Sequence, residues 1–270
     1  MKREPVRISI FPKEEGSWDT IWKWSWFTKE LWLSQLRKED QIALRPLFSL
    51  LPKLQIKSIL DSSCGLGFKT VLFAKMGYEV EGSDASAIAI KYAPQLAKDE
   101  GVNIKFFHSR YEELGKKCKR KYDCVYSDNF DEIRTRKTLR SSAKGIYSVL
   151  RKGGKLIFCG VLPGWSKSDL KKLIEKEWEK RKRFDILPPS EKDGVRVTSL
   201  EVDEKTPEGI LENHIFLIEE QGVMRAEIAF IMNPRIKWTF KNYIEVLKEV
   251  GFRKVDYIKK EEQIFNIGIK

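Results

Sequence analysis

The residues with the clearest chemical potential form one glycine-rich string, Ile59-Leu-Asp-Ser-Ser-Cys-Gly-Leu-Gly-Phe-Lys-Thr70. A glycine-rich turn between a strand and a helix lets the main chain approach a ligand closely and presents N–H groups at a helix N-terminus. Phe68 stands where a phosphate-binding P-loop needs glycine, which disfavours a phosphate ligand. Thr70 replaces the third small residue of the dinucleotide fingerprint, which weakens NAD or FAD binding without excluding it.

An acidic residue follows the next apolar run. Asp84 comes directly after residues 78–83, which are predicted to form a strand. A carboxylate at such a strand end can accept both hydroxyls of an adenosine ribose in charge-assisted hydrogen bonds. NAD is held in the same way, so Asp84 indicates a nucleoside rather than a reaction. Asp84 could equally cap the following helix, as could Ser86, and the two roles are compatible.

Both motifs lie in a chain whose short apolar runs alternate with longer helical patterns. The alternation predicts strands at 58–61, 78–83, 104–107, 122–126 and 155–159, helices at 69–76, 86–98 and 138–150, and a turn at 151–154. Such alternation implies βαβ units and a mostly parallel, doubly wound sheet. The later segments break the pattern: a charged helix at 166–183, antiparallel strands at 195–202, 210–219 and 223–231, a helix at 240–250 and a hairpin of 254–258 with 263–269.

Five stretches of this chain carry a resemblance to one family. Residues 61–67 resemble motif I of class I S-adenosylmethionine-dependent methyltransferases, and Gly82-Ser-Asp-Ala-Ser86 resembles the motif after their second strand. Residues 109–114 and 124–130 stand where that family contacts adenine and lines the methionine moiety. Leu150-Arg-Lys-Gly-Gly-Lys-Leu-Ile157 resembles the turn before its fifth strand, with Lys152 in place of proline. The resemblance covers roughly residues 17–164 and 236–269, and it implies S-adenosyl-L-methionine as the cofactor.

The resemblance also implies which residues form the cofactor site. They are Asp61, Ser63, Cys64, Gly65, Gly67, Asp84, Ala85, Ser86, Arg110, Tyr111, Ser127 and Asp128. Arg110 stands where many members of the family have an acidic residue. The expected adenine contact therefore shifts to stacking on the ring of Tyr111.

Within the family, the spacing most resembles the glycine and sarcosine N-methyltransferases and related small-molecule enzymes. That group holds its substrate carboxylate with an arginine just after the fifth strand, whereas residues 158–163 of this chain contain no cation. Glycine is therefore not expected as the substrate. The expected acceptor is a small molecule, with an amine nitrogen favoured.

The overall expectation is an α/β fold: a Rossmann-like, doubly wound, seven-stranded and mostly parallel sheet with a β-rich insertion and an aromatic N-terminal helical segment. The expected boundaries are an aromatic lid segment at 1–34, a cofactor-binding domain at 35–164 with 234–270, and an inserted helix and antiparallel strands at 165–233.

Methyl transfer from a sulfonium needs positioning and exclusion of water more than activation. A nucleophilic amine must also lose its proton, which a nearby carboxylate can accept. Asp128, Asn129 and Glu132 are the expected catalytic residues because they follow the fourth predicted strand, and Asp131 lies among them. The alternative is that these acids are merely solvated, as most exposed carboxylates are.

Tryptophans crowd the N-terminal segment. Trp18, Trp22 and Trp26 are spaced for one helical face, and aromatic faces attract cations such as a sulfonium or a methylated amine. They are candidate substrate or lid residues. The alternative is that this face packs against the sheet or the insertion.

The distribution of basic residues is also compatible with a second function. The 270 residues carry a formal net charge of +12, and eight Lys or Arg but no acid lie between Ile133 and Phe158. A second basic run, Lys116-Lys-Cys-Lys-Arg-Lys121, precedes the fourth strand. These runs suit an RNA methyltransferase acting on tRNA or rRNA, although RNA is not favoured because no known RNA-binding domain accompanies them. A non-catalytic accessory subunit that binds S-adenosylmethionine is a further alternative.

The composition limits which other classes of protein and site are possible. With 41% hydrophobic residues the chain can build a core, and no run of 18 apolar residues suggests a membrane span. The N-terminal residues lack the apolar core of a signal peptide. Four cysteines and two histidines show no metal-ligand spacing. We expect a cytoplasmic protein with no metal and no membrane partner, and homo-oligomerisation stays open.

Overall fold

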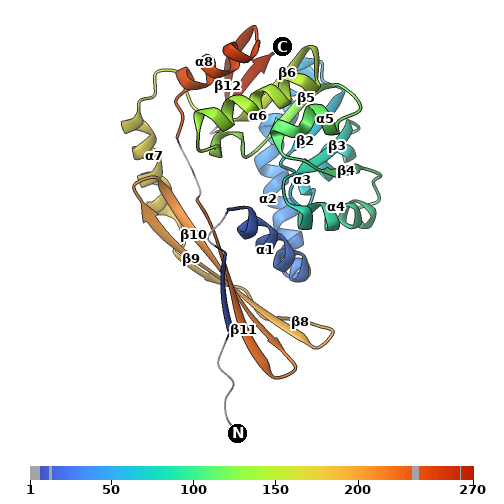
Figure 1. Ribbon diagram of the computed structural model, residues 1–270, viewed down its shortest axis with the longest axis vertical. Coiled ribbons are helices and arrows are strands. Elements are labelled where there is room, and N and C mark those ends of the chain that lie inside the picture. The colour runs from blue at the N-terminus through green and yellow to red at the C-terminus, as the bar shows by residue number, and fades with distance from the viewer. Residues whose placement is uncertain (1–6, 12–13, 233–236, 262) are drawn as a thin grey trace. The chain divides into compact units, whose positions relative to one another are not determined.

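In the computed structural model, residues 7–11, 14–232, 237–261 and 263–270 are described, and the expected domain boundary at 233–234 lies outside them. The chain divides into two compact units: Met1–Leu36 with Lys171–Arg235, and Arg37–Leu170 with Ile236–Lys270 (Figure 1). Helices α2 (Lys29–Leu50) and α7 (Lys167–Lys180) each contain residues of both units. None of the helices formed by the described residues combines the length and the apolar character that a membrane span requires.

The second unit is built on a seven-stranded sheet. Its order is β12 (Lys254–Lys260), β13 (Gln263–Ile269), β6 (Leu150–Cys159), β5 (Tyr122–Ser127), β2 (Ser58–Ser62), β3 (Glu79–Asp84) and β4 (Lys105–His108). Strands β6, β5, β2, β3 and β4 pair in parallel, whereas β13 is antiparallel to both of its neighbours. The expected fold class, a mostly parallel doubly wound sheet, is confirmed.

Both faces of this sheet are buried, because successive residues of one strand enter different cores. Ile59 and Tyr126 pack with Leu47 of α2 and Phe73 of α3 (Phe68–Lys75). Their neighbours in β2 and β5 point to the opposite core, which also holds residues of α6 (Arg136–Val149) and α8 (Phe240–Val250). All five residues of β2 are accordingly buried, as is typical of a central parallel strand.

The helices of this unit begin and end at residues that satisfy their terminal backbone groups. Ser86 caps α4 (Ala87–Asp99), since its hydroxyl oxygen accepts the N–H of Ala89 at 3.0 Å. Thr239 and Asn242 form a capping box at the start of α8, and Gly251 ends that helix with φ of 116°. Short helical segments join the remaining strands: η1 (Pro52–Leu54), η2 (Tyr111–Glu113), α5 (Leu114–Lys117) and η3 (Phe130–Glu132).

The expected turn at 151–154 is wrong. Strand β6 already starts at Leu150, which pairs with Tyr122, and the next pair joins Lys155 to Cys124. More residues lie between Leu150 and Lys155 than between Tyr122 and Cys124, so the strand contains an irregularity there. Within it, the N–H of Gly153 donates to the carbonyl of Lys270 at 2.9 Å. Pro46 lies inside α2, which continues to Leu50.

The first unit is a mainly antiparallel sheet with a helix on one face. Its strands are β1 (Arg7–Phe11), β7 (Phe184–Ile186), β8 (Ser190–Lys192), β9 (Val195–Thr206), β10 (Gly209–Glu220) and β11 (Val223–Met232). The order is β1-β11-β10-β9-β7, with β8 paired to β9. Strand β1 is parallel to β11 and was not anticipated, because its partner lies more than 200 residues further along the chain. Helix α1 (Glu14–Phe27) packs Ile21 and Trp24 against this sheet.

Candidate functional site

The glycine-rich loop joins β2 to α3 in a shape that side chains rarely permit. Gly65 and Gly67 adopt positive φ angles of 52° and 87°, and Ser63, a non-glycine residue, has φ of 129°. The N–H groups of Ser63 and Cys64 donate to the carbonyl of Ser83 on β3, at 2.8 and 3.1 Å. The loop is thus tied to the neighbouring strand, and such strained turns mark functional sites more often than structural ones.

Asp84 at the end of β3 holds this loop and the following helix together. Its Oδ2 accepts the N–H of Gly65 and its Oδ1 accepts the N–H of Ser86, both at 2.8 Å. The cap of α4 is the Ser86 hydroxyl rather than the Asp84 carboxylate. Each carboxylate oxygen can accept a second hydrogen bond. The contact of this carboxylate with the ribose hydroxyls, which the sequence predicts, stays a prediction.

Asp61, the last but one residue of β2, is a buried carboxyl group beneath the loop. The hydroxyl of Thr70 donates to its Oδ2 at 2.6 Å. The pKa of Asp61 is raised to about 7, mainly by burial and also by the carboxylates of Asp128 and Asp84, against the opposing effects of Thr70 and Lys69. The carboxylates of Asp128 and Asp84 are thus close enough to oppose the ionisation of Asp61, although burial is the larger cause.

Two of the glycines make room for a ring of the protein itself. A Cβ atom on Gly67 would lie 2.9 Å from Cζ of Phe106, and one on Gly82 would lie 2.5 Å from Cδ1 of the same ring. Phe106 belongs to β4 and packs with Val71 of α3. No sequence signal connected Phe106 with the loop, because the contact is made only when β4 pairs with β3.

The predicted site residues Ser63, Tyr111 and Ser127 come together in one hydrogen-bonded chain. Tyr111 Oη lies 2.7 Å from Ser127 Oγ, which lies 3.2 Å from Ser63 Oγ. Burial raises the pKa of Tyr111 well above its usual value. The Tyr111 ring meets Phe130 edge to face, with centroids 6.0 Å apart. Its expected stacking on adenine stays a prediction.

The other predicted cofactor residues differ in accessibility. Cys64 is buried with its thiol 3.5 Å from the carbonyl oxygen of Gly65, and burial raises the pKa of that thiol well above its usual range. It is thus no candidate nucleophile. Arg110 and Ala85 are exposed, and the carbonyl of Ala85 lies 2.8 Å from Nε2 of His108.

Asp128, expected to be both a cofactor and a catalytic residue, is held by two partners. Lys69 Nζ donates to its Oδ2, and the hydroxyl of Tyr126 donates to its Oδ1. Lys69 lies in the first turn of α3 and was not singled out from the sequence. The only sequence signal for it is a lysine placed directly after the glycine-rich loop, where a cation can reach the end of β5.

Asn129 and Glu132 bind each other, since Asn129 Nδ2 donates to Glu132 Oε2 at 3.3 Å. Between them, Asp131 buries its Oδ1, which has no hydrogen-bond partner among the described residues. Burial raises the pKa of Asp131 to about 7, with a further contribution from Asp128. A desolvated carboxyl group of this kind can exchange a proton near neutral pH.

The tryptophans belong to the first unit. Trp18 and Trp22 stack with ring centroids 5.3 Å apart, and Lys29 Nζ lies 4.0 Å from the ring centroid of Trp26. The residue that packs most closely on the sheet is Trp24, which is 4% exposed and donates from Nε1 to Glu227 at 2.7 Å. The face of Trp18, Trp22 and Trp26 is thus only partly buried, and its lid role stays a prediction.

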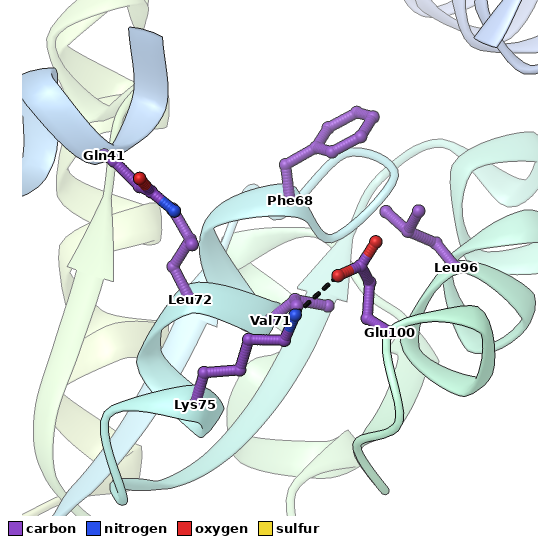
Figure 2. A pocket seen from close by; sticks show the side chains of 7 residues that line it. All are labelled: Gln41, Phe68, Val71, Leu72, Lys75, Leu96 and Glu100. Atoms are coloured by element: carbon purple, nitrogen blue, oxygen red, sulfur yellow. Dashed lines mark hydrogen bonds and ion pairs between the residues drawn. The ribbon is translucent and has the colours of Figure 1, made fainter. Parts of the chain in front are cut away.

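A shallow pocket beside α3 and α4 is separate from these residues. Figure 2 shows Phe68, Leu72 and Lys75 of α3 with Leu96 and Glu100 around it. Lys75 and Glu100 form an ion pair of 2.6 Å across the pocket. Because it contains none of the predicted cofactor residues, the pocket is not the candidate site.

Comparisons with known proteins give information on the class of protein to which this chain is similar. Residues 59–154 match a family model described as a methyltransferase domain. An uncharacterized RNA methyltransferase of Protochlamydia amoebophila is 26% identical over 100 residues, which are 37% of this chain and 23% of that protein. The match thus spans less than a quarter of the curated relative.

Two solved structures share the fold. An S-adenosylmethionine-dependent methyltransferase of Clostridium acetobutylicum superposes with a TM-score of 0.58 at 15% identity, covering 83% of this chain and 89% of that one. The sugar N-methyltransferase KedS8 of a Streptoalloteichus species gives a TM-score of 0.56 at 12% identity, covering 88% and 85%.

Residues 59–154 therefore match a methyltransferase domain, and the second unit has the fold of class I methyltransferases. For this chain, S-adenosyl-L-methionine is the cofactor that such a domain implies. The residues around the loop fit such a molecule. The turn carries no side chain at Gly65, and the carboxylates near the loop favour a cation. The parallel strands end at this edge, where doubly wound sheets bind their ligands.

Proposed function

We propose that the protein transfers a methyl group from S-adenosyl-L-methionine to a small-molecule acceptor, with an amine nitrogen as the methylated atom. The observation that carries this proposal is the glycine-rich loop with Asp84: the carboxylate at the end of β3 accepts the N–H of Gly65, in a turn of positive φ at the carboxyl edge of the parallel strands. The match to a methyltransferase domain covers the same residues. Beside the carboxylates of Asp61 and Asp84, a cationic cofactor is favoured over the pyrophosphate of NAD or FAD.

The cofactor, when bound, supplies a methyl group already activated on a sulfonium, so the chain needs no residue that attacks it. Asp84 accepts the ribose hydroxyls, and the N–H groups at the start of α3 approach the rest of the molecule. Lys69 neutralises Asp128 and fixes its position at the end of β5. The buried chain of Ser63, Ser127 and Tyr111 excludes water from the same edge.

The acceptor side of the proposal rests on Asp131. An amine attacks only as the neutral base, so its proton must move to another group before the nitrogen–carbon bond forms. Asp131 has a buried oxygen without a described partner and a pKa of about 7, which lets it hold that proton near neutral pH. Asp128, Asn129 and Glu132 each have a protein partner and serve better to position the site.

The sugar N-methyltransferase KedS8 acts on a nitrogen, as its name states, and this agrees with an amine acceptor without identifying one. The resemblance to glycine and sarcosine N-methyltransferases remains part of the proposal. The direct experiment is a screen for transfer of labelled methyl groups to amines, aminosugars, amino acids, thiols and RNA. Labelled product with amines, lost in the Asp84→Ala variant, is the expected result; labelling of thiols or RNA alone would contradict the acceptor class.

One specific observation favours a second candidate, an RNA methyltransferase: the named relative from Protochlamydia. Some arginines of the two basic runs are, however, paired with acids. Arg136 contacts Glu245 and Glu249 at 3.0 and 2.6 Å, and Arg151 contacts Asp123 at 2.9 Å. These pairs reduce the charge available for phosphates. Retention on bulk RNA that persists at moderate salt would favour the RNA function, because purely non-specific charge binding is lost steeply with salt.

A further inference from the structure

The two faces of the antiparallel sheet in the first unit differ in whether their side chains belong to a buried cluster. On one face, Val197, Phe216 and Ile218 form a buried cluster with Ile21 and Trp24 of α1. Residues directly opposite in an antiparallel pair share a face, so the register assigns the alternate residues of β9, β10 and β11 to the other face. Among the described residues, none of those alternate side chains belongs to a buried cluster.

This second face, here called the outer face, is apolar across four strands. Its central row pairs Ile186 of β7 with Leu200, Leu200 with Ile215, and Ile215 with Ile228. The row on one side holds Phe184, Val202, Asn213 and Phe230, and the row on the other holds Thr198, Leu217 and Ala226. Phe184 and Ile186 are each 51% exposed.

Charged side chains appear only where this apolar area ends. Arg196 lies opposite Glu219 beyond the row of Leu217, and Glu204 follows Val202 at the other end of β9. All three are exposed. An apolar centre with a polar rim is the anatomy of a protein–protein interface. A membrane-binding surface would instead be expected to show a basic rim.

We propose that the outer face is the contact surface between two copies of this chain. With strands about 4.8 Å apart and same-face residues about 6.8 Å apart, the apolar rows cover on the order of 400 Å² in projection. With the charged rows added, the face approaches the roughly 800 Å² per partner of a standard interface. Phe184 and Ile186 are exposed on this face, Ala226 is buried and the other named side chains are half-buried, so a partner would cover apolar surface that is still partly open.

Self-association suits this face better than a charged partner does. The three apolar rows contain no ionisable side chain, so nothing in them selects an acidic or basic ligand. Two sheets pack face to face when their strands lie within about 30° of each other. A two-fold axis perpendicular to the strands brings the Arg196 end of one copy to the Glu204 end of the other, which joins opposite charges.

The test is the mass of the full chain in solution, measured by light scattering and by sedimentation at micromolar concentration. The wild type should have the mass of two chains. Ile186→Lys, at a half-exposed position, should raise the dimer Kd by about 100-fold or more, because the symmetry places the buried charge in the interface twice. Ile42→Lys is the matched control: Ile42 is 73% exposed on α2, is not one of the outer-face residues, and its variant should remain dimeric.

Circular dichroism and the melting temperature of Ile186→Lys show whether the variant is folded, and Phe184→Lys provides an independent substitution in the neighbouring row. A wild type that is monomeric, including a monomer that binds lipid vesicles, would overturn the proposal. So would a dimer that both folded variants leave unchanged. The readout is mass, so it does not depend on whether the acceptor has been identified.

Discussion

The Oδ2 oxygen of Asp84 accepts the backbone N–H of Gly65 at 2.8 Å, so the acid at the end of β3 directly sets the shape of the glycine-rich loop after β2. The glycine-rich loop and the acid at the end of β3, which are separate motifs in the sequence, are therefore parts of one site. If the Asp84 carboxylate also binds the ribose, it has two roles: it fixes the loop and it binds the cofactor. Substitutions at Asp84 will consequently affect both the loop and the ligand.

Replacing Asp84 by alanine should abolish detectable cofactor binding. The change removes two charge-assisted hydrogen bonds to the main chain and the proposed bonds to the ribose hydroxyls, each worth about 1.5–3 kcal/mol. Titration calorimetry with S-adenosyl-L-methionine measures the effect, with Asp84→Asn as the isosteric comparison. Unchanged affinity in a folded Asp84→Ala variant would remove Asp84 from the site.

Gly67→Ala should cost clearly more stability than Gly77→Ala. Both glycines have φ of 87°, so both variants incur the left-handed penalty of about 1–2 kcal/mol. Only at Gly67 does the new Cβ meet a ring, at 2.9 Å from Phe106, whereas nothing lies within 4 Å at Gly77. The excess, about 1–3 kcal/mol from overpacking, is the difference between the two free energies of unfolding in urea. Equal losses would mean that the Phe106 ring moves aside freely.

The buried Asp61 should make stability depend on pH in a definite direction. Its pKa is about 7 in the folded protein against an ordinary value of 3.8, so the folded state holds an extra proton between these values. Its contribution to stability is therefore present at low pH and is lost as pH rises through that window. Asp61→Asn should gain stability relative to wild type across the same range, by about 4 kcal/mol at most. Urea unfolding at pH 5 and pH 8 checks the sign; a relative stability independent of pH would contradict it.

Asp131→Asn should lower the methyl-transfer rate by about 100-fold while leaving cofactor affinity near the wild-type value. A base must be ionised to accept a proton, so the wild-type rate should rise with pH through about 7, and this inflection should vanish in the variant. Single-turnover rates across pH provide the measurement. Glu132→Gln is the neighbouring control, because Glu132 already binds Asn129. Loss of the inflection in Glu132→Gln instead would assign the base to Glu132.

Features set by neighbouring residues could be predicted from the sequence. The Ser86 cap, the stop at Gly251 and the position of Asp84 after β3 each depend on a few adjacent positions. The partners of those features could not be predicted, because they come from distant strands. Lys69 meets Asp128 across 59 residues, and Phe106 reaches Gly67 only once β3 and β4 have paired.

The aromatic segment shows the same limit on a helix. Its spacing made Trp18, Trp22 and Trp26 prominent, yet Trp24 and Ile21 form the packed face. Periodicity identifies a stripe of like residues but does not say which stripe is covered, since that depends on the surface it meets. Here the decisive partner, Glu227, lies 203 residues away along the chain.

That separation has a consequence for biosynthesis. The indole of Trp24 and the hydroxyl of Ser17 find their partners, Glu227 and Phe230, only after β11 has left the ribosome. At ordinary translation speeds of about 5–20 residues per second, this interval lasts roughly 10 to 40 s. During it the nascent N-terminal helix has no native surface to cover its tryptophans, so this segment is where a chaperone would engage the growing polypeptide.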